Sequence, residues 1–188
     1  MKEQNSLTAQ ESLDIITKMI SEAKGNMSRN GFYFLLWGWV VVAANIGMYA
    51  LQQIGYKHFY VVWAITIPAW IISMIRGYRE GKAQRNTTHL DTVSMWLWLT
   101  FGVTIFTLVA FGSKINFQLN PVILTVSSIP TFISGIVIRF RPLVFGGISF
   151  WIFGIISFLT PMETQPLIGA VAILCGYIVP GYLLKTKE

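Results

Sequence analysis

The amino-acid sequence predicts an all-α fold: a polytopic membrane bundle of six transmembrane helices with an amphipathic helix at its N-terminus. The chain of 188 residues is 54% hydrophobic and 12% charged, with a mean hydropathy of +0.58, and is too apolar for an ordinary soluble surface. Its apolar residues form six runs of roughly 20 residues, the length that crosses a bilayer as a helix. Its basic residues fall mainly in alternate gaps between these runs.

The membrane spans are predicted at residues 32–54, 59–75, 92–112, 119–138, 143–160 and 165–184. Of the fourteen Lys and Arg residues, twelve lie in segments on one side of a membrane crossed by these spans in turn, and only Lys57 and Lys114 lie on the other. Basic residues near span ends are enriched on the cytoplasmic side. Both termini are therefore expected in the cytoplasm, in a chain divided into an N-terminal segment, residues 1–31, and a six-helix domain, residues 32–188.

The N-terminal segment is expected to form a cytoplasmic amphipathic helix. Thr8 and Glu11 have the spacing of a capping box, and Gly25 with Asn26 is typical of a helix end. Apolar residues at alternating intervals of three and four positions predict a narrow seam, the candidate face for a protein partner: Leu13, Ile16, Ile20, Ala23 and Met27. Acidic and basic residues balance each other in this segment, so it has little attraction to anionic lipid.

Prolines mark the starts of the later spans. Asn120 and Pro121 predict the N-cap and first turn of the fourth span, and Pro142 and Pro166 lie in the first turns of the fifth and sixth. The connection at residues 139–142 is short, so the fourth and fifth spans are expected to lie antiparallel and in contact. The same argument applies to the fifth and sixth spans.

The second, fourth and sixth spans each contain a proline in a similar frame of aliphatic, proline, small, aromatic and aliphatic residues. The frames are residues 67–71, 129–133 and 179–183. Three helical hairpins related by an axis along the membrane normal are one interpretation, and chance similarity between apolar spans is the other. Pro68, Pro130 and Pro180 are candidate kinks, because a proline inside a helix frees the carbonyl four residues before it.

Uncharged polar residues inside the spans are the candidate lining of a cavity between such kinked helices. They are Asn45, Thr104, Thr131 and Ser149. Prolines that bend helices around a packed core, and hydrogen bonds between helices, explain the same residues without a ligand, and Asn45 in particular is expected to bond to another helix. All eight acidic residues fall outside the spans, which disfavours transport coupled through a buried carboxylate.

The sequence contains no arrangement typical of an enzyme. His58 and His89, the two histidines, are expected at opposite ends of the bundle, where they cannot share a metal ion or activate one nucleophile. Cys175 is the single cysteine and is expected to be a small buried residue. No catalytic, cofactor or metal site is therefore predicted. The basic residues also lack the patch expected of a nucleic-acid-binding protein.

One loop, between the second and third spans, carries a cluster of basic residues. Its members are Arg76, Arg79, Lys82 and Arg85. They are candidates for contact with anionic lipid headgroups, each contributing about 1 kcal/mol near a charged membrane surface. Their part in orienting the spans explains the same cluster without a specific lipid.

Three segments of the chain, residues 11–27, 32–39 and 176–185, resemble sequences of uncharacterised small multi-pass membrane proteins of Bacteroidota. The similarity covers both ends of the chain. It implies a location in a bacterial inner membrane, and it carries over no activity, ligand or site residue.

The sequence favours a non-catalytic regulatory or interaction protein that uses its N-terminal cytoplasmic helix. Its surroundings are the lipid bilayer, and its expected partner is a cytoplasmic or membrane protein. The basis is the apolar seam next to a membrane domain without buried charge. The alternative is a facilitative transporter or channel for a small neutral or amphipathic solute. The identity of the partner or solute and the oligomeric state stay open.

Overall fold

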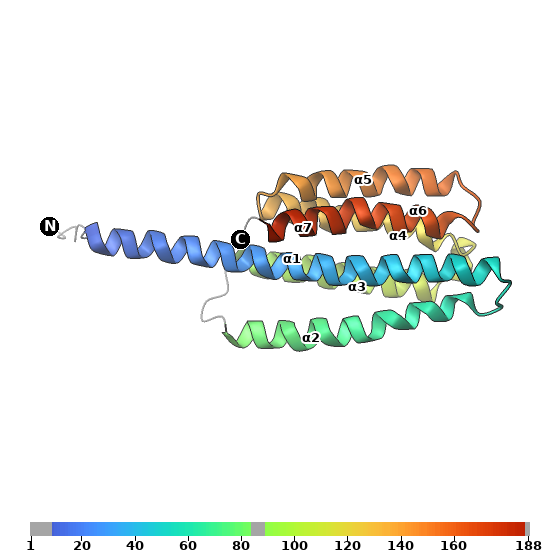
Figure 1. Ribbon diagram of the computed structural model, residues 1–188, viewed down its shortest axis with the longest axis horizontal. Coiled ribbons are helices and arrows are strands. Elements are labelled where there is room, and N and C mark those ends of the chain that lie inside the picture. The colour runs from blue at the N-terminus through green and yellow to red at the C-terminus, as the bar shows by residue number, and fades with distance from the viewer. Residues whose placement is uncertain (1–8, 84–88, 187–188) are drawn as a thin grey trace.

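The structure, a computed structural model, describes the backbone of residues 9–83 and 89–186 and the side chains of residues 31–82 and 92–186. The α-helices of the described backbone are α1 (Ala9–Gln53), α2 (Thr66–Ala83), α3 (His89–Ala110), α4 (Leu119–Val137), α5 (Arg141–Phe158), α6 (Gln165–Ile173) and α7 (Val179–Lys185). Two 3₁₀ helices, η1 (Phe59–Ile65) and η2 (Gly112–Ile115), and one π-helix, η3 (Leu174–Ile178), join or extend them. Figure 1 shows the long helices running nearly parallel to one axis.

Six helical segments of the described chain are long and apolar enough to cross a membrane, which confirms the predicted helical bundle. They cover Gly31–Gln53, Phe59–Lys82, Thr92–Ala110, Leu119–Val137, Arg141–Phe158 and Gln165–Lys185. The second is longer than the predicted span 59–75, because α2 continues beyond its apolar part to Ala83. The sixth consists of α6, η3 and α7, which follow one another without a gap.

The first helix, α1, runs without interruption from Ala9 to Gln53, so the helix end expected at Gly25 and Asn26 is absent. A glycine inside a helix costs only about 1 kcal/mol, which the long helix on both sides of it can offset. Figure 1 shows the N-terminal part of α1 continuing past the ends of the neighbouring helices. The expected start at Thr8 and the side chains of the predicted seam lie outside the described residues.

Helices α4 and α5 pack against each other most closely, which confirms that they are antiparallel neighbours. Gly147 allows this approach, because a Cβ atom at that position would lie 2.8 Å from Phe132 Cα. In the turn between them, the Phe140 amide donates to the Gly135 carbonyl at 2.8 Å and the Arg139 amide donates to the Ile136 carbonyl at 3.0 Å. This is a Schellman motif, with Arg139 in the left-handed conformation at φ 53°.

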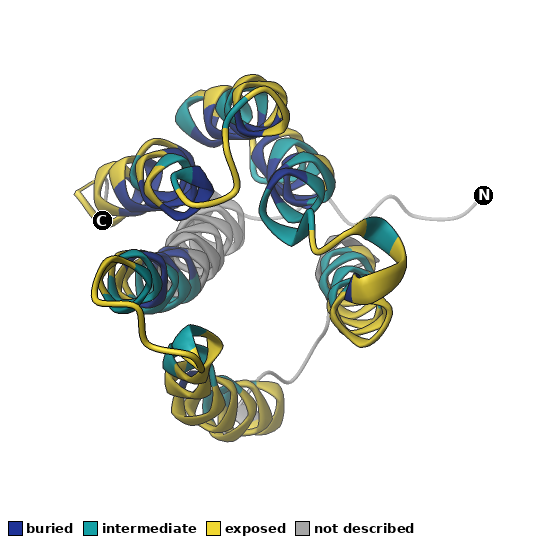
Figure 2. Cartoon of the chain, turned by 90° about the vertical axis from the view of Figure 1, so that its right-hand side faces the viewer, coloured by how far each residue is buried: buried dark blue, intermediate teal, exposed yellow. Residues whose placement is uncertain are grey.

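Burial is uneven around the bundle. The windows of α4 and of the sixth span are 44% and 56% buried, whereas those of the second and third spans are 6% and 0% buried. In the end-on view of Figure 2, the dark blue buried residues accordingly gather on one side of the bundle, and the helices on the other side are mostly yellow. Helix α2 contacts α1, and α3 contacts α4. The core is therefore built by α1, α4, α5 and the sixth span, with α2 and α3 at its edge.

The three prolines of the repeated frame occupy three different local structures. Pro68 is exposed in the first turn of α2, directly after η1. Pro130 is buried inside α4, as a mid-helix proline. Pro180 is buried in the first turn of α7, directly after the π-helix η3. Only Pro130 therefore lies in the interior of an α-helix, and the hairpin repeat stays a prediction.

Candidate functional site

Carboxamide side chains from three helices meet inside the bundle. Asn120 in the first turn of α4 donates from Nδ2 to Asn45 Oδ1 of α1 at 3.3 Å and to the backbone carbonyl of Gln165 at 2.9 Å. Asn45 is 3% exposed and donates from Nδ2 to the Val41 carbonyl at 2.9 Å. The expected hydrogen bond from Asn45 to another helix is confirmed. Asn120 was expected as an N-cap, but α4 begins after Gln118, and Asn120 instead connects helices.

Gln165, which is 2% exposed, extends this group to the end of α5. Its Nε2 lies 2.8 Å from Gln118 Oε1, 3.2 Å from the Ser157 carbonyl and 3.3 Å from the Thr160 carbonyl. The last carbonyls of a helix have no partner within the helix itself, and an unpaired carbonyl is costly where water is excluded. Gln165 therefore serves as a C-terminal cap for α5. We refer to Asn45, Gln118, Asn120 and Gln165 as the amide cluster.

The amide cluster needs a glycine beside it. A Cβ atom on Gly169 of α6 would lie 2.8 Å from both Asn45 Oδ1 and Asn120 Nδ2. These distances are shorter than a Cβ atom tolerates, so a larger residue would push the two amides apart. Gly169 provides this space where α1, α4 and α6 approach one another.

A second polar contact lies deeper in the bundle, between α4 and the π-helix η3. Thr131 Oγ1 lies 2.7 Å from the Ser127 carbonyl and 3.3 Å from the hydroxyl of Tyr177. The Tyr177 ring also packs edge-on against Phe150, with ring centres 4.9 Å apart, and lies 5.5 Å from the ring of Phe34. Thr131 is therefore held in a closely packed aromatic core.

The other two candidate cavity residues lie elsewhere. Thr104 of α3 donates to the Thr100 carbonyl at 2.9 Å, and Ser149 of α5 donates to the Gly146 carbonyl at 2.7 Å. Both bonds stay within one helix. Among the described residues, no hydrogen bond joins any two of the four candidate side chains, Asn45, Thr104, Thr131 and Ser149.

Cys175 lies on the outside of the bundle. Its side chain is exposed, although the sequence led us to expect burial. The residues of η3 that are buried are instead Gly176, Tyr177 and Ile178.

Arg76, the first residue of the predicted basic cluster, interacts within the protein. Its Nε donates to Glu80 Oε1 at 2.7 Å, and its guanidinium carbon lies 3.8 Å from the centre of the Phe32 ring. The Tyr33 hydroxyl donates to the other oxygen of Glu80 at 3.1 Å. These contacts connect the cytoplasmic ends predicted for the first two spans.

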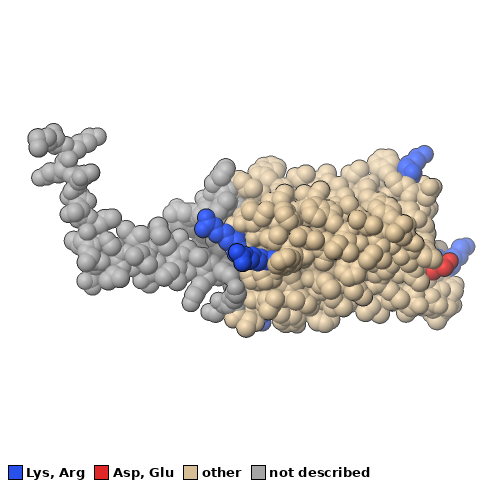
Figure 3. All heavy atoms as spheres, turned by 90° about the horizontal axis from the view of Figure 1, so that it is seen from above, with Lys and Arg blue, Asp and Glu red and all other residues tan. Residues whose placement is uncertain are grey.

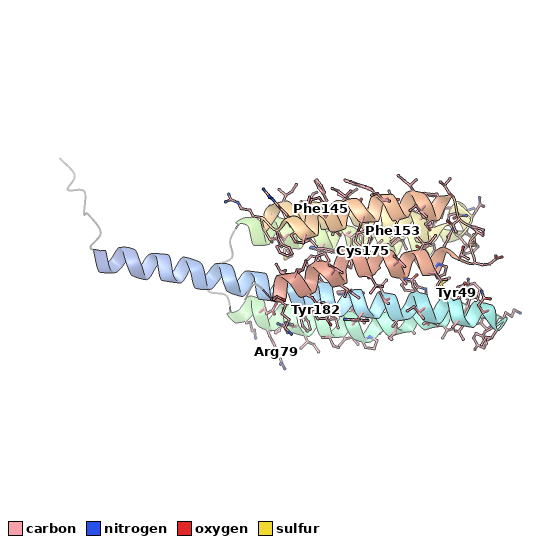
Figure 4. All side chains as sticks on the ribbon, turned by 45° about the horizontal axis from the view of Figure 1, so that its top comes forward. Tyr49, Arg79, Phe145, Phe153, Cys175 and Tyr182 are labelled. Carbon is pink, nitrogen blue, oxygen red and sulfur yellow. The ribbon has the colours of Figure 1, made fainter. Side chains whose placement is uncertain are left out.

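The remaining basic residues of the cluster differ in their surroundings. Arg79 is exposed, and Figure 4 shows its side chain extending away from the helices. The Lys82 ammonium lies 4.7 Å from the centre of the Tyr78 ring. Arg85 lies outside the described residues. Arg79 is therefore the member of the described cluster best placed for an anionic headgroup.

The amide cluster contains neutral groups that both donate and accept hydrogen bonds. Such groups can connect helices and close helix ends, and they provide no strong acid, base or nucleophile at membrane depth. Sequence reasoning missed Gln118 and Gln165. The signal that could have found them is their position at the start of an apolar run. Gln165 directly precedes Pro166, and Gln118 lies three positions before Pro121.

The fold and the amide cluster define a class of protein: an all-helical bundle whose six long apolar segments are compatible with a multi-pass membrane protein. Comparison of the chain with protein-family models, curated proteins and solved structures gave no match. The functional argument therefore depends on the residues of the chain itself.

Proposed function

We propose that the chain is a non-catalytic membrane interaction protein that presents the N-terminal part of α1 to a cytoplasmic or membrane protein partner. The observation that carries this proposal is the continuity of α1, which is one helix from Ala9 to Gln53. A helix that only had to cross the bilayer would need about 20 residues. The sequence predicts that the membrane span of α1 begins at residue 32, so the helix of residues 9–30 is additional to the span.

This additional helix is long enough to serve as a docking element. At a rise of 1.5 Å per residue, residues 9–30 extend roughly 33 Å beyond the span. Residues spaced by three and four positions share one side of a helix, so the sequence predicts a narrow apolar stripe made of the seam residues, Leu13, Ile16, Ile20, Ala23 and Met27. An apolar stripe of this spacing is the usual recognition pattern for a partner helix or an apolar groove.

The membrane part of α1 is fixed to the bundle, which supports a role in holding the additional helix in a defined direction. Gly38 of α1 lies so close to the sixth span that a Cβ atom on it would be 2.8 Å from a methylene carbon of Ile178. Nearby, Trp39 Nε1 donates to the hydroxyl of Tyr182 on α7 at 3.3 Å. Asn45 provides the bond to α4 described above. A partner bound to residues 9–30 would therefore be connected directly to the packed core.

The proposal is tested by changing the seam without changing the membrane domain. The full chain and its variant Ile16→Asp with Ile20→Asp are solubilised from membranes of the source organism, and co-purifying proteins are quantified by mass spectrometry. Two carboxylates on the seam oppose its burial against an apolar partner. We therefore expect the amount of the specific co-purifying partner to fall by about tenfold or more.

The matched control adds the same two charges away from the seam, as Ser21→Asp with Asn26→Asp. It should keep the partners of the unchanged chain. A partner set that is the same for the seam variant, the control and a chain lacking residues 1–28 would rule out the proposed function. Insertion of all variants in the membrane is checked by fractionation before the comparison.

A further inference from the structure

A pocket of about 440 Å³ opens at the end of the bundle where α1 meets η1 and α5 meets α6. The residues that line it are Gln52, Gly55, Tyr56, Lys57, Phe59, Met162 and Glu163. This volume lies within the range of small-molecule sites in proteins. The pocket is at the end of the apolar segments, which is the level of the phospholipid headgroups when such segments cross a bilayer.

The pocket carries one positive and one negative side chain, Lys57 and Glu163. Both are exposed, and neither takes part in a salt bridge within the part of the chain that the structure describes. Figure 3 shows an acidic and a basic group close together at the end of the bundle away from the N-terminus. A site with two opposite charges that are not paired with each other is complementary to a zwitterion and less so to a simple anion or cation.

Gln52 adds an acceptor that the protein leaves unused. Its Oε1 atom is buried and has no hydrogen-bond partner. A buried acceptor without a donor costs about 1–3 kcal/mol. Because the atom has almost no accessible surface, a ligand with an N–H group reaches it only when the Gln52 side chain turns toward the pocket. The neighbouring His58 Nδ1 and Tyr60 hydroxyl bond to each other at 2.7 Å, and neither bonds to Gln52 Oε1.

We propose that this pocket binds the phosphoethanolamine group, a phosphate next to a primary ammonium. Lys57 provides a point charge for the phosphate. The ammonium has three N–H donors. Exposed Glu163 can accept one of them, and the Gln52 oxygen can accept another once its side chain turns toward the pocket. Tyr56 and Phe59 are aromatic residues at a span end, where such side chains contact both headgroups and the first part of the acyl chains. The expected source of the group is therefore a phospholipid.

The test uses the purified full chain in detergent micelles and three short-chain dihexanoyl phospholipids, with bound lipid counted by native mass spectrometry. Phosphatidylethanolamine should bind roughly tenfold more tightly than phosphatidylcholine, whose ammonium has no N–H, and than phosphatidylglycerol, which has no ammonium. Lys57→Gln should weaken binding of phosphatidylethanolamine and phosphatidylglycerol alike. Glu163→Gln and Gln52→Leu should weaken binding of phosphatidylethanolamine only.

The matched control is Lys114→Gln, which removes an exposed charge from another loop at the same end of the bundle. It should leave the lipid preference unchanged. Soluble phosphoethanolamine is titrated in parallel. If soluble phosphoethanolamine displaces the lipid at a similar concentration, the phosphoethanolamine site is supported, and its source is a free metabolite and not a phospholipid. Equal binding of the three lipids, or a preference that survives Glu163→Gln, would overturn the proposal.

Discussion

At the scale of single residues, polar side chains in this bundle bond chiefly to backbone carbonyls. Thr100, Thr104 and Thr107 of α3 each donate to a carbonyl four residues before them. Such bonds satisfy a hydroxyl in an apolar environment without a partner helix. Gln165 is different, because its bonds reach the loop before α4 and the end of α5.

Gln165→Leu is therefore expected to destabilise the protein. It leaves the Thr160 carbonyl and Gln118 Oε1 without the side-chain donor that Gln165 provides and removes one of the donors to the Ser157 carbonyl, at a cost of about 1–3 kcal/mol. Thermal unfolding in detergent, followed by the loss of monodisperse protein, measures the effect. Gln53→Leu, at an exposed position, is the control and should change the midpoint little. Equal midpoints for both variants would show that the cap contributes nothing.

Gly147→Ala is expected to disturb the contact between α4 and α5. Its Cβ atom would lie 2.7 Å from Phe132 Cβ and 2.8 Å from the Phe132 backbone nitrogen, so the helices must separate. Overpacking of this kind costs about 1–3 kcal/mol. Gly102→Ala in α3 is the matched control, because a Cβ atom there meets nothing within 4 Å. It should be neutral or stabilising, since Ala is the better helix former. The same unfolding measurement distinguishes the two variants.

At the scale of elements, α2 is held to α1 mainly by side chains near its surface. Trp37 Nε1 donates to Ser73 Oγ at 3.1 Å, and the Tyr33, Glu80 and Arg76 contacts lie further along the same pair of helices. The second span is 6% buried, compared with 44% for α4. Helices with little burial open at lower free energy than those of the core.

Backbone amides of α2 are therefore expected to exchange with deuterium faster than those of α4, by about tenfold or more in detergent micelles. Trp37→Phe removes the bond to Ser73 and should speed exchange in α2 while leaving α4 unchanged. Peptide-resolved mass spectrometry gives both rates in one experiment. Similar protection of α2 and α4 would contradict this ranking of the helices.

At the scale of the whole molecule, the distribution of Lys and Arg predicts the orientation in the membrane. With Cys175 replaced by Ala, a cysteine at Lys114 should react with a membrane-impermeant thiol reagent in intact cells. A cysteine at Lys185 should react only after the membrane is permeabilised. Labelling of the Lys185→Cys variant in intact cells would reverse the predicted topology and place residues 9–30 outside the cytoplasm.

Most of the fold follows from hydrophobic pattern, because length and apolarity alone limit what can cross a bilayer. The second, fourth and sixth spans begin at the predicted residue, and the fifth begins two residues earlier. Helix α2 continues past residue 75, the predicted end of the second span, because charged residues such as Arg76 and Glu80 can extend a helix beyond its apolar part. The helix end predicted at Gly25 was wrong. Glycine is a weak helix former, but a single glycine costs too little to end a helix that is stable on both sides of it.

The candidate site was predicted less well than the fold. Asn45 could be identified because it is a strongly polar residue in an apolar run, but its partners could not. Asn120 is 75 positions away along the chain, and Gln165 is 45 positions further from Asn120. Such neighbours depend on how the helices pack, and one sequence contains no direct signal for that packing. For the same reason Thr104 and Ser149 looked equivalent to Thr131, although only Thr131 is fully buried.

Helix α1 is continuous, so residues 9–30 are expected to move together with its membrane part. Because no hinge separates its membrane part from residues 9–30, a change in tilt within the bilayer is transferred to the whole helix. Helix tilt responds to bilayer thickness, and a rotation of about 10° moves the tip of an arm of roughly 33 Å sideways by about 6 Å. In a bilayer, a change of thickness that tilts the membrane part of α1 would therefore also displace residues 9–30.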